Sequence, residues 1–285
     1  MKRLSTYEEY TGIVGRVFQK IRFDTNNLNT TQGIKKKIKN GAVYCEEGDF
    51  GAWILTDVGN YYLATIYLIK GKILPKPPDM EKTILAELIG TKKRYGYELE
   101  SVLQEVGFCK YAKNLELVSS KEDVGKLTKN VDVGKRIFSK HGFIFHDMSE
   151  LNETYFQDIF SFWKKVIDPY AIHALTENDY RLLRDNDRGI FVTDAKGEVA
   201  GAGYYEKEGN VGYAHHIAVK SEYNGLGLGG VVMNACAEKA FREKIEKYIS
   251  WIAEDNEESI RIHKRMGKFT GKFSQQFLLQ KERRK

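Results

Sequence analysis

The chain has 285 residues, of which 42% are hydrophobic and 29% charged, with a formal net charge of +6 at pH 7. That is enough apolar material for one large or two ordinary folded domains. No apolar run is long enough for a membrane span, and the N-terminal residues lack the apolar core of a secretory signal, so we expect a cytoplasmic protein without membrane contact. The dispersed lysines indicate solvated surface rather than a nucleic-acid partner. Three scattered cysteines, Cys45, Cys109 and Cys236, exclude a disulfide framework or a zinc site, and Cys236 is expected in a core.

In the first half, apolar spacing predicts two helices, three strands, a further strand, a third helix and a last strand. Their expected ranges are 5–21, 30–39, 41–44, 51–55, 61–69, 83–89, 98–106 and 111–118. Between the third and fourth strands, residues 70–79 contain three prolines, which cannot donate backbone amides and would not open a helix smoothly. The polar, weakly periodic residues 119–136 are the best candidate for a linker between two halves.

The second half predicts two helices, three antiparallel strands, a helix, a strand, a helix and a final strand. The expected ranges are 151–167, 177–184, 189–193, 199–206, 211–219, 230–245, 248–254, 256–266 and 273–279. Turns at Lys196–Gly197 and Gly209–Asn210 separate the three antiparallel strands. Both halves are therefore α/β in composition, with helices and strands mixed along the chain.

Residues 219–230 join an apolar strand to an apolar helix and hold four glycines in their last six positions. A missing Cβ permits positive φ and lets a ligand lie against the backbone, while the helix N-terminus adds partial positive charge. Phosphate or pyrophosphate fits such a loop. Residues 225–230 also match G-x-G-x-x-G, the dinucleotide fingerprint. That fingerprint normally follows the first strand of its fold and precedes several βα units, so an NAD(P)-binding oxidoreductase is the weakest of our hypotheses.

A different match is stronger. Val219, Asn224, Gly227 and Gly229 resemble the acetyl-CoA loop of the GNAT N-acetyltransferase superfamily, V-x-x-x-x-Q/R-x-x-G-x-G/A. Asn224 stands where Gln or Arg is usual in that family.

Residues 256–268 resemble the last helix of the same superfamily, N-x-x-A-x-x-x-Y-x-x-x-G-F, at the same spacing. Ser259 replaces the family's Ala, His263 replaces its Tyr, and Lys268 replaces its Phe. Two motifs in the right order and separation are more specific than either motif alone.

The resemblance covers residues 145–285 and implies a mixed sheet flanked by helices. The first half has the same element order and a similar close at Gly107–Phe108, but it lacks the glycine loop. We therefore predict an α/β fold of tandem GNAT-like domains. Residues 1–118 would be a degenerate domain, 119–144 a linker and 145–285 the acetyltransferase domain. An unrelated α+β domain in the first half is the alternative.

The resemblance implies acetyl-CoA as the cofactor. The loop amides would hold its pyrophosphate, and the strand before the loop would pair with its pantetheine arm. Asn256 is also a good helix N-cap. The predicted cofactor-binding residues are Ile217, Ala218, Val219, Asn224, Gly225, Leu226, Gly227, Leu228, Gly229, Gly230 and Asn256.

Transfer to an amine requires a base near the strand and a proton donor for the leaving thiolate. His215 and His216 lie on that strand, and histidine titrates near neutrality. Successive strand residues face opposite sides, so we expect only one of them, with His215 preferred, to face the acyl group. His263 occupies the position of the family's tyrosine, which is thought to protonate the thiolate. Glu206, at the end of the preceding strand, and Glu254 and Asp255, at the end of the next strand, are alternative bases acting through water.

We therefore predict an N-acetyltransferase that acetylates a primary amine of a small molecule by direct attack. Tyr170, His173 and Tyr180 could line the acceptor pocket. Acetylation of a protein or peptide and a CoA-binding sensor without turnover are the rival hypotheses. A homodimer is compatible with the sequence, and no metal is expected.

Overall fold

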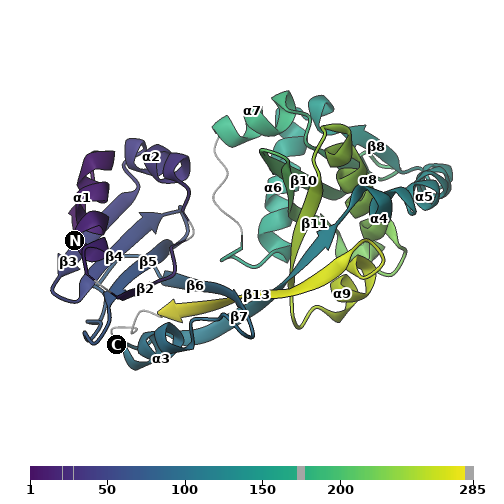
Figure 1. Ribbon diagram of the computed structural model, residues 1–285. Coiled ribbons are helices and arrows are strands. Elements are labelled where there is room, and N and C mark those ends of the chain that lie inside the picture. The colour runs from purple at the N-terminus through teal and green to yellow at the C-terminus, as the bar shows by residue number, and fades with distance from the viewer. Residues whose placement is uncertain (21, 28, 172–176, 280–285) are drawn as a thin grey trace, which may run out of the picture. The chain divides into compact units, whose positions relative to one another are not determined.

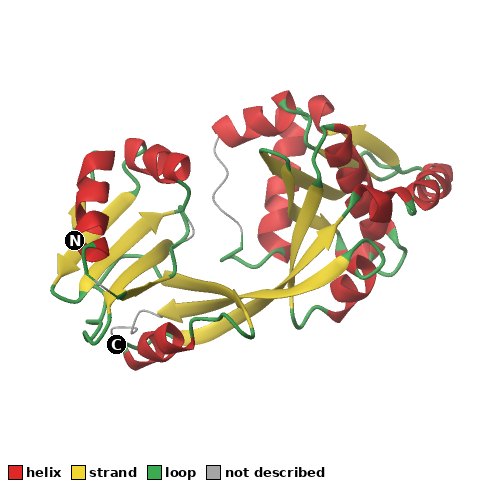
Figure 2. Ribbon diagram, in the orientation of Figure 1, coloured by secondary structure: helices red, strands yellow, loops and turns green. Residues whose placement is uncertain are grey.

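The computed structural model describes residues 1–279 except 21, 28 and 172–176, and it divides into two compact units (Figure 1). Unit 1 contains residues 1–114 together with the chain's last strand from Lys272, and unit 2 contains residues 115–271. Each unit is a β-sheet covered by helices on both faces (Figure 2). No helix within the described ranges is long and apolar enough to cross a lipid bilayer.

Unit 1 begins with helices whose N-termini are capped by side chains. Thr6 and Glu9 form a capping box at the start of α1, and Thr30 accepts a hydrogen bond from the Gly33 amide at the start of α2. The elements of this unit are β1 (Lys2–Arg3), α1 (Tyr7–Phe18), β2 (Phe23–Thr25), α2 (Thr31–Lys39), β3 (Val43–Gly48), β4 (Gly51–Asp57), β5 (Tyr62–Ile69), β6 (Ile84–Thr91), α3 (Tyr97–Glu105) and the first part of β7 (Cys109–Ser119).

The sheet of unit 1 has the order β1-β3-β4-β5-β6-β13, in which β13 (Lys268–Leu279) is the last strand of the chain, and β2 pairs with β5. β4 is buried on both faces: Ala52 and Ile54 pack with α1 and α2, while Trp53 and Leu55 pack with α3. This alternation follows from the two-residue period of a strand. Residues 70–83, between β5 and β6, form no helix.

Helices cover both faces of the sheet of unit 2. α6 and α7 pack over Phe191 and Tyr204, whereas α4, α5 and α8 pack over Val192 and Tyr205. The elements are the last part of β7, α4 (Lys121–Gly125), α5 (Thr128–Lys140), β8 (Ile144–Asp147), η1 (Met148–Glu150), α6 (Glu153–Val166), α7 (Glu177–Asp185), β9 (Gly189–Thr193), β10 (Val199–Glu208), β11 (Val211–Val219), η2 (Ser221–Tyr223), α8 (Leu228–Arg242), β12 (Lys247–Ala253), α9 (Glu257–His263) and the first residues of β13 (Lys268–Leu279).

The strand order in unit 2 is β7-β12-β11-β10-β9-β8. β9, β10 and β11 are antiparallel neighbours, and β11 and β12 are parallel. Every helix and strand predicted from the sequence has a counterpart, which confirms the mixed α/β fold class. Cys236 is fully buried in the α8 core, as expected.

The division of the chain differs from the predicted boundaries in two places. Residues 119–144 contain α4 and α5, which pack on α8, so most of this stretch belongs to the core of unit 2. The last strand, from Lys272 onward, pairs with β6 in unit 1. An alternating apolar pattern predicts a strand but does not specify its partner, and a weak helical period hides short helices.

Candidate functional site

The glycine loop of unit 2 follows a strand that separates from its parallel neighbour. β11 and β12 pair over three positions, the last of which joins Tyr213 to Ile249. Within the described residues their register goes no further, although β11 continues to Val219 and β12 to Ala253. All residues from Tyr213 to Val219 keep part of their surface exposed, which is unusual for a strand in the middle of a sheet. We call this feature the β11–β12 divergence.

The other edge of β11 carries a β-bulge at the two adjacent histidines. The register with β10 passes from Ala202–Ala218 to Tyr204–His215, so β11 holds one extra residue there. His216 has a φ of 42°, a left-handed conformation that residues other than glycine seldom adopt. Strained backbone of this kind is often found at functional sites.

The bulge places both imidazole rings against Tyr204. The Tyr204 ring is stacked on His215 with centroids 5.3 Å apart, and it meets His216 edge-on at 5.5 Å. His216 also lies 5.6 Å from the ring of Trp163 on α6. Strand alternation predicts that the two histidines face opposite sides; the extra residue of the bulge cancels that alternation locally.

Two further side chains of this aromatic cluster matter for its chemistry. Trp163 is fully buried, and its Nε1 has no hydrogen-bond acceptor among the described residues. A buried donor without a partner costs free energy, so Trp163 is suited to donate to a bound molecule. Glu206, whose side chain is mostly exposed, lies 3.7 Å from Nε2 of His215. Sequence reasoning missed Trp163 and Tyr204, because each fits the apolar pattern of its own element.

The loop between β11 and α8 keeps its glycines in conformations that they adopt easily. Gly225 has φ 78° and Gly227, the N-cap of α8, has φ 88°. A Cβ built on either residue would meet nothing within 4 Å, so space lies next to the backbone. Asn224 and Leu226 are exposed, and Leu228 is buried in the core.

The N-terminus of α8 presents amides to that space. The Val231 amide donates to the Gly227 carbonyl at 3.2 Å and closes the first turn of the helix. The amides of Leu228, Gly229 and Gly230 precede this bond, and a helix offers them no acceptor. Together with the helix dipole they favour an anion. These residues therefore fit a pyrophosphate group.

The last helix, α9, lies beside the glycine loop. A Cβ on Gly230 would be 3.8 Å from Ile262 on α9. Asn256 caps α9 by accepting the Ser259 amide at 2.9 Å. Nδ1 of His263 lies 2.8 Å from the Ser259 carbonyl oxygen, a geometry in which Nδ1–H donates. Burial lowers the pKa of His263, so the neutral ring is favoured.

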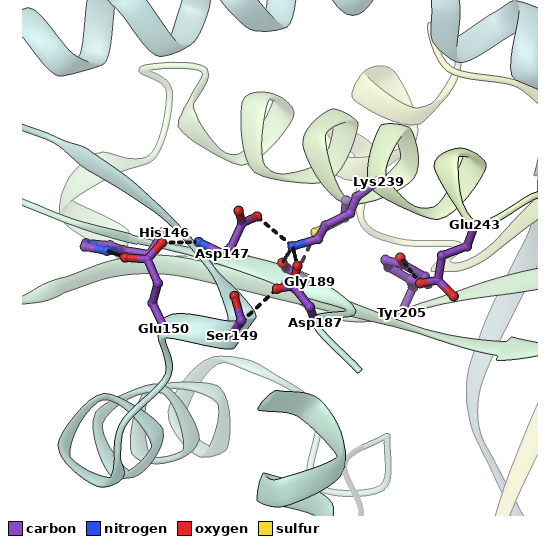
Figure 3. A network of polar contacts seen from close by, with 11 residues as sticks. His146, Asp147, Ser149, Glu150, Asp187, Gly189, Tyr205, Lys239 and Glu243 are labelled. Atoms are coloured by element: carbon purple, nitrogen blue, oxygen red, sulfur yellow. Dashed lines mark hydrogen bonds and ion pairs between the residues drawn. The ribbon is translucent and has the colours of Figure 1, made fainter. Parts of the chain in front are cut away.

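Unit 2 also contains a polar cluster at the C-terminal half of α8 (Figure 3). Lys239 contacts Asp147 and Asp187, with each nitrogen–oxygen distance 2.6 Å, and Asp187 accepts the Ser149 amide at 2.8 Å. Its residues border a cavity of about 380 Å³. Since each charge in the cluster has an opposite charge beside it, the cluster joins β8, β9 and α8 rather than presenting a charge to a ligand.

Glu243 extends this cluster. It accepts from Tyr205 and pairs with Arg188. Burial acts to raise the pKa of Glu243, but the hydrogen bonds from Tyr205 and Arg188 outweigh it, and the pKa is lowered. The carboxylate is therefore ionised at neutral pH and keeps the contact between β10 and the end of α8 intact.

Of the three residues considered for an acceptor pocket, one belongs to the core. Tyr180 is buried, and its hydroxyl donates to the Leu151 carbonyl at 3.2 Å. Tyr170 is half-buried next to Asp168, whose carboxylate accepts the Tyr170 amide. His173 lies outside the described residues.

The antiparallel strands, the β11–β12 divergence and the glycine loop at a helix N-terminus agree with the GNAT fold expected for unit 2. Residues 145–268 match the model of the acetyltransferase (GNAT) family. No curated protein matches the sequence.

Solved structures extend the likeness to the whole chain. A tandem GNAT protein from the clavulanic acid biosynthesis pathway has a TM-score of 0.61 at 12% identity, and the match covers 96% of both chains. A GCN5-related N-acetyltransferase from Kribbella flavida has a TM-score of 0.53 at 12% identity, covering 85% of this chain and 91% of the other. A GCN5-related N-acetyltransferase from Sphaerobacter thermophilus has a TM-score of 0.50 at 8% identity, with 89% and 88% covered. The chain therefore has a tandem GNAT fold.

Proposed function

We propose that unit 2 transfers the acetyl group of acetyl-CoA to a primary amine of a small molecule, by direct attack of the amine on the thioester. The observation that carries this proposal is the β11–β12 divergence, because the half-exposed strand leads directly into the open glycine loop. A long, flexible ligand with an anionic group in the middle suits this arrangement. Acetyl-CoA has that shape and supplies the activated acetyl group.

Backbone groups of the chain would make most of the cofactor contacts. The pyrophosphate fits the amides of 225–230 at the start of α8, and the pantetheine amides fit the backbone of Ile217, Ala218 and Val219 along the divergence. Asn224 is exposed at the mouth of the loop and can donate from its carboxamide. Asn256 holds α9 in place through its cap.

We assign the general base to the histidine pair, with His215 preferred over His216. The amine must lose a proton as its nitrogen bonds to the acetyl carbon, and an imidazole can accept that proton. Glu206 near Nε2 of His215 would stabilise the resulting cation. The imidazole ring of His216 and the ring of Tyr204 would then hold His215 in position.

The departing thiolate needs a proton or strong hydrogen bonds. The sequence predicts that His263 supplies the proton, yet its Nδ1–H contacts the Ser259 carbonyl and burial lowers its pKa, which favours the neutral form. We therefore propose for His263 at most a minor share in protonation, and stabilisation of the thiolate by solvent and the start of α8.

Thiol release from acetyl-CoA tests the proposal. The full chain is incubated with amino acids, polyamines, aminosugars and a lysine peptide in turn, and the free thiol of CoA is measured. Release with a small amine but not with the peptide supports the proposal. Release with the peptide alone would support protein acetylation instead.

A thermal-shift series separates the two remaining hypotheses, because a ligand that binds only the folded state raises its melting temperature. Stabilisation by CoA without turnover on any amine would indicate a CoA sensor. Stabilisation by NADH alone would refute the acetyltransferase proposal. The second outcome is disfavoured, since antiparallel β10 beside β11 departs from the parallel sheet of a dinucleotide-binding fold.

A further inference from the structure

Unit 1 repeats the divergence of parallel strands seen in unit 2. β5 and β6 are parallel and pair over three positions, the last of which joins Ala64 to Ala86. Beyond it, within the described residues, the two strands share no further register, although β5 continues to Ile69 and β6 to Thr91. In element order, β5 corresponds to β11 and β6 to β12.

The chain itself fills the space beside β5 in unit 1. β2 runs antiparallel to β5, with Phe23 opposite Ile69 and Thr25 opposite Tyr67. The segment therefore occupies the edge of β5 that β6 leaves after Ala64. None of the described strands takes this place beside β11 in unit 2.

Asn26 continues from β2 into the point where β5 and β6 separate. Its Oδ1 accepts the Ile66 amide at 2.7 Å, and its Nδ2 donates to the carbonyls of Ala64 and Glu87 at 2.9 and 3.1 Å. One carboxamide thus binds both strands. Each amide of pantetheine also has a carbonyl acceptor and an N–H donor. The Asn26 carboxamide therefore offers the backbone of β5 and β6 the same two kinds of hydrogen-bonding group.

β5 in unit 1 is more deeply buried than its counterpart β11 in unit 2. β5 is buried at six of its eight positions, whereas β11 is buried at one of nine. Asn29, further along the same segment, donates to the Thr65 hydroxyl at 3.2 Å and accepts from Lys37. The covered edge of β5 therefore extends from Ala64 to Ile69.

We propose that residues 23–26 close the cleft of unit 1 that corresponds to the cofactor cleft of unit 2, so that each chain binds one acyl-CoA, and binds it in unit 2. The identity of the ligand, acyl-CoA, rests on the proposed function. The closure of the cleft in unit 1 does not depend on it. The helix-free residues 70–83 remove the anion site, and Asn26 with β2 removes the strand edge. Unit 1 is thereby complete without a cofactor.

Hydrogen–deuterium exchange of the full chain tests the closure in two arms. In the first arm, Asn26→Ala is compared with the wild type and with Asn40→Ala, an exposed asparagine at the end of α2. Loss of the three bonds should speed exchange across residues 64–69 by about tenfold or more, and the control should leave it unchanged. An unchanged rate in Asn26→Ala overturns the closure.

The second arm uses the wild type and so remains decisive if Asn26→Ala does not fold. Added CoA should slow exchange at 217–219 and 228–230 and leave residues 64–69 unaffected. Slower exchange at 64–69 overturns the inference. If CoA slows exchange nowhere, the proposed function fails, and the first arm still decides whether Asn26 closes the cleft.

Discussion

The replacement Gly227→Ala tests whether the backbone of the glycine loop binds the cofactor. Gly227 has φ 88°, and a Cβ there would meet nothing within 4 Å, so the substitution causes backbone strain without a clash. A left-handed conformation costs a residue with a Cβ about 1–2 kcal/mol. The loop can keep its geometry at that cost, or relax and turn its amides away from the ligand.

Relaxation would remove at least one hydrogen bond to the pyrophosphate. A hydrogen bond to a charged group contributes about 1.5–3 kcal/mol, so the affinity for CoA should fall by about 10- to 150-fold. Isothermal titration of CoA into the full chain measures this directly. The melting temperature should fall by about 2–8 °C, because a domain of this size loses roughly 2–4 °C per kcal/mol.

Gly209→Ala is the matched control. Gly209 lies in the β10–β11 turn with φ 59° and also has open space at its Cβ position. It should cost similar stability and leave CoA affinity unchanged, since it lies at the opposite end of β11 from the loop. Equal affinities of the two variants for CoA would refute the assignment of the pyrophosphate to this loop.

Three further substitutions test the remaining assignments. His215→Gln should lower kcat by about 10²- to 10⁴-fold with little change in CoA affinity, and undiminished turnover would reject it as the base. Burial lowers the pKa of His263 from 6.5, so the folded state binds fewer protons than the unfolded state, and stability should fall as the pH drops below about 6.5. Urea unfolding at about pH 7.5 and 5.5 should show a smaller fall in His263→Gln, and an identical fall would contradict this. Lys239→Met should cost about 1–3 kcal/mol in urea unfolding because it leaves two carboxylates facing each other, whereas the exposed Arg242→Met should cost under about 0.5 kcal/mol. Equal losses would show that the Lys239 contacts contribute little.

The sequence predicts the helices and strands well because most of them have strong periods and clear end signals. β11 is predicted at its observed bounds, 211–219, since a Gly–Asn turn precedes it and the glycine loop follows. The glycine loop can be found in the sequence because its proposed function depends on backbone conformations with positive φ, which glycine adopts most easily. Local signals of this kind are fully present in one sequence.

Features that depend on contacts between distant segments of the chain are not predictable in this way. The bulge at His216 arises from the pairing of β11 with β10, and no residue between 202 and 218 marks where the extra position falls. In the sequence Asn26 is one of several polar residues in a connecting segment, and its role follows only from the separation of β5 and β6. The partner of the last strand is equally hidden, because β6 and β13 are far apart in the sequence.

The pairing of β13 with β6 has a consequence for the order in which the chain is made. Unit 2 is continuous, and all of its residues have been synthesised before Lys272. Unit 1 includes residues 1–114 but lacks one strand of its sheet until residues 272–279 leave the ribosome. Folding in the order of synthesis therefore finishes the second unit before the first. A chain truncated before β13 would leave the edge of β6 open to association with other chains.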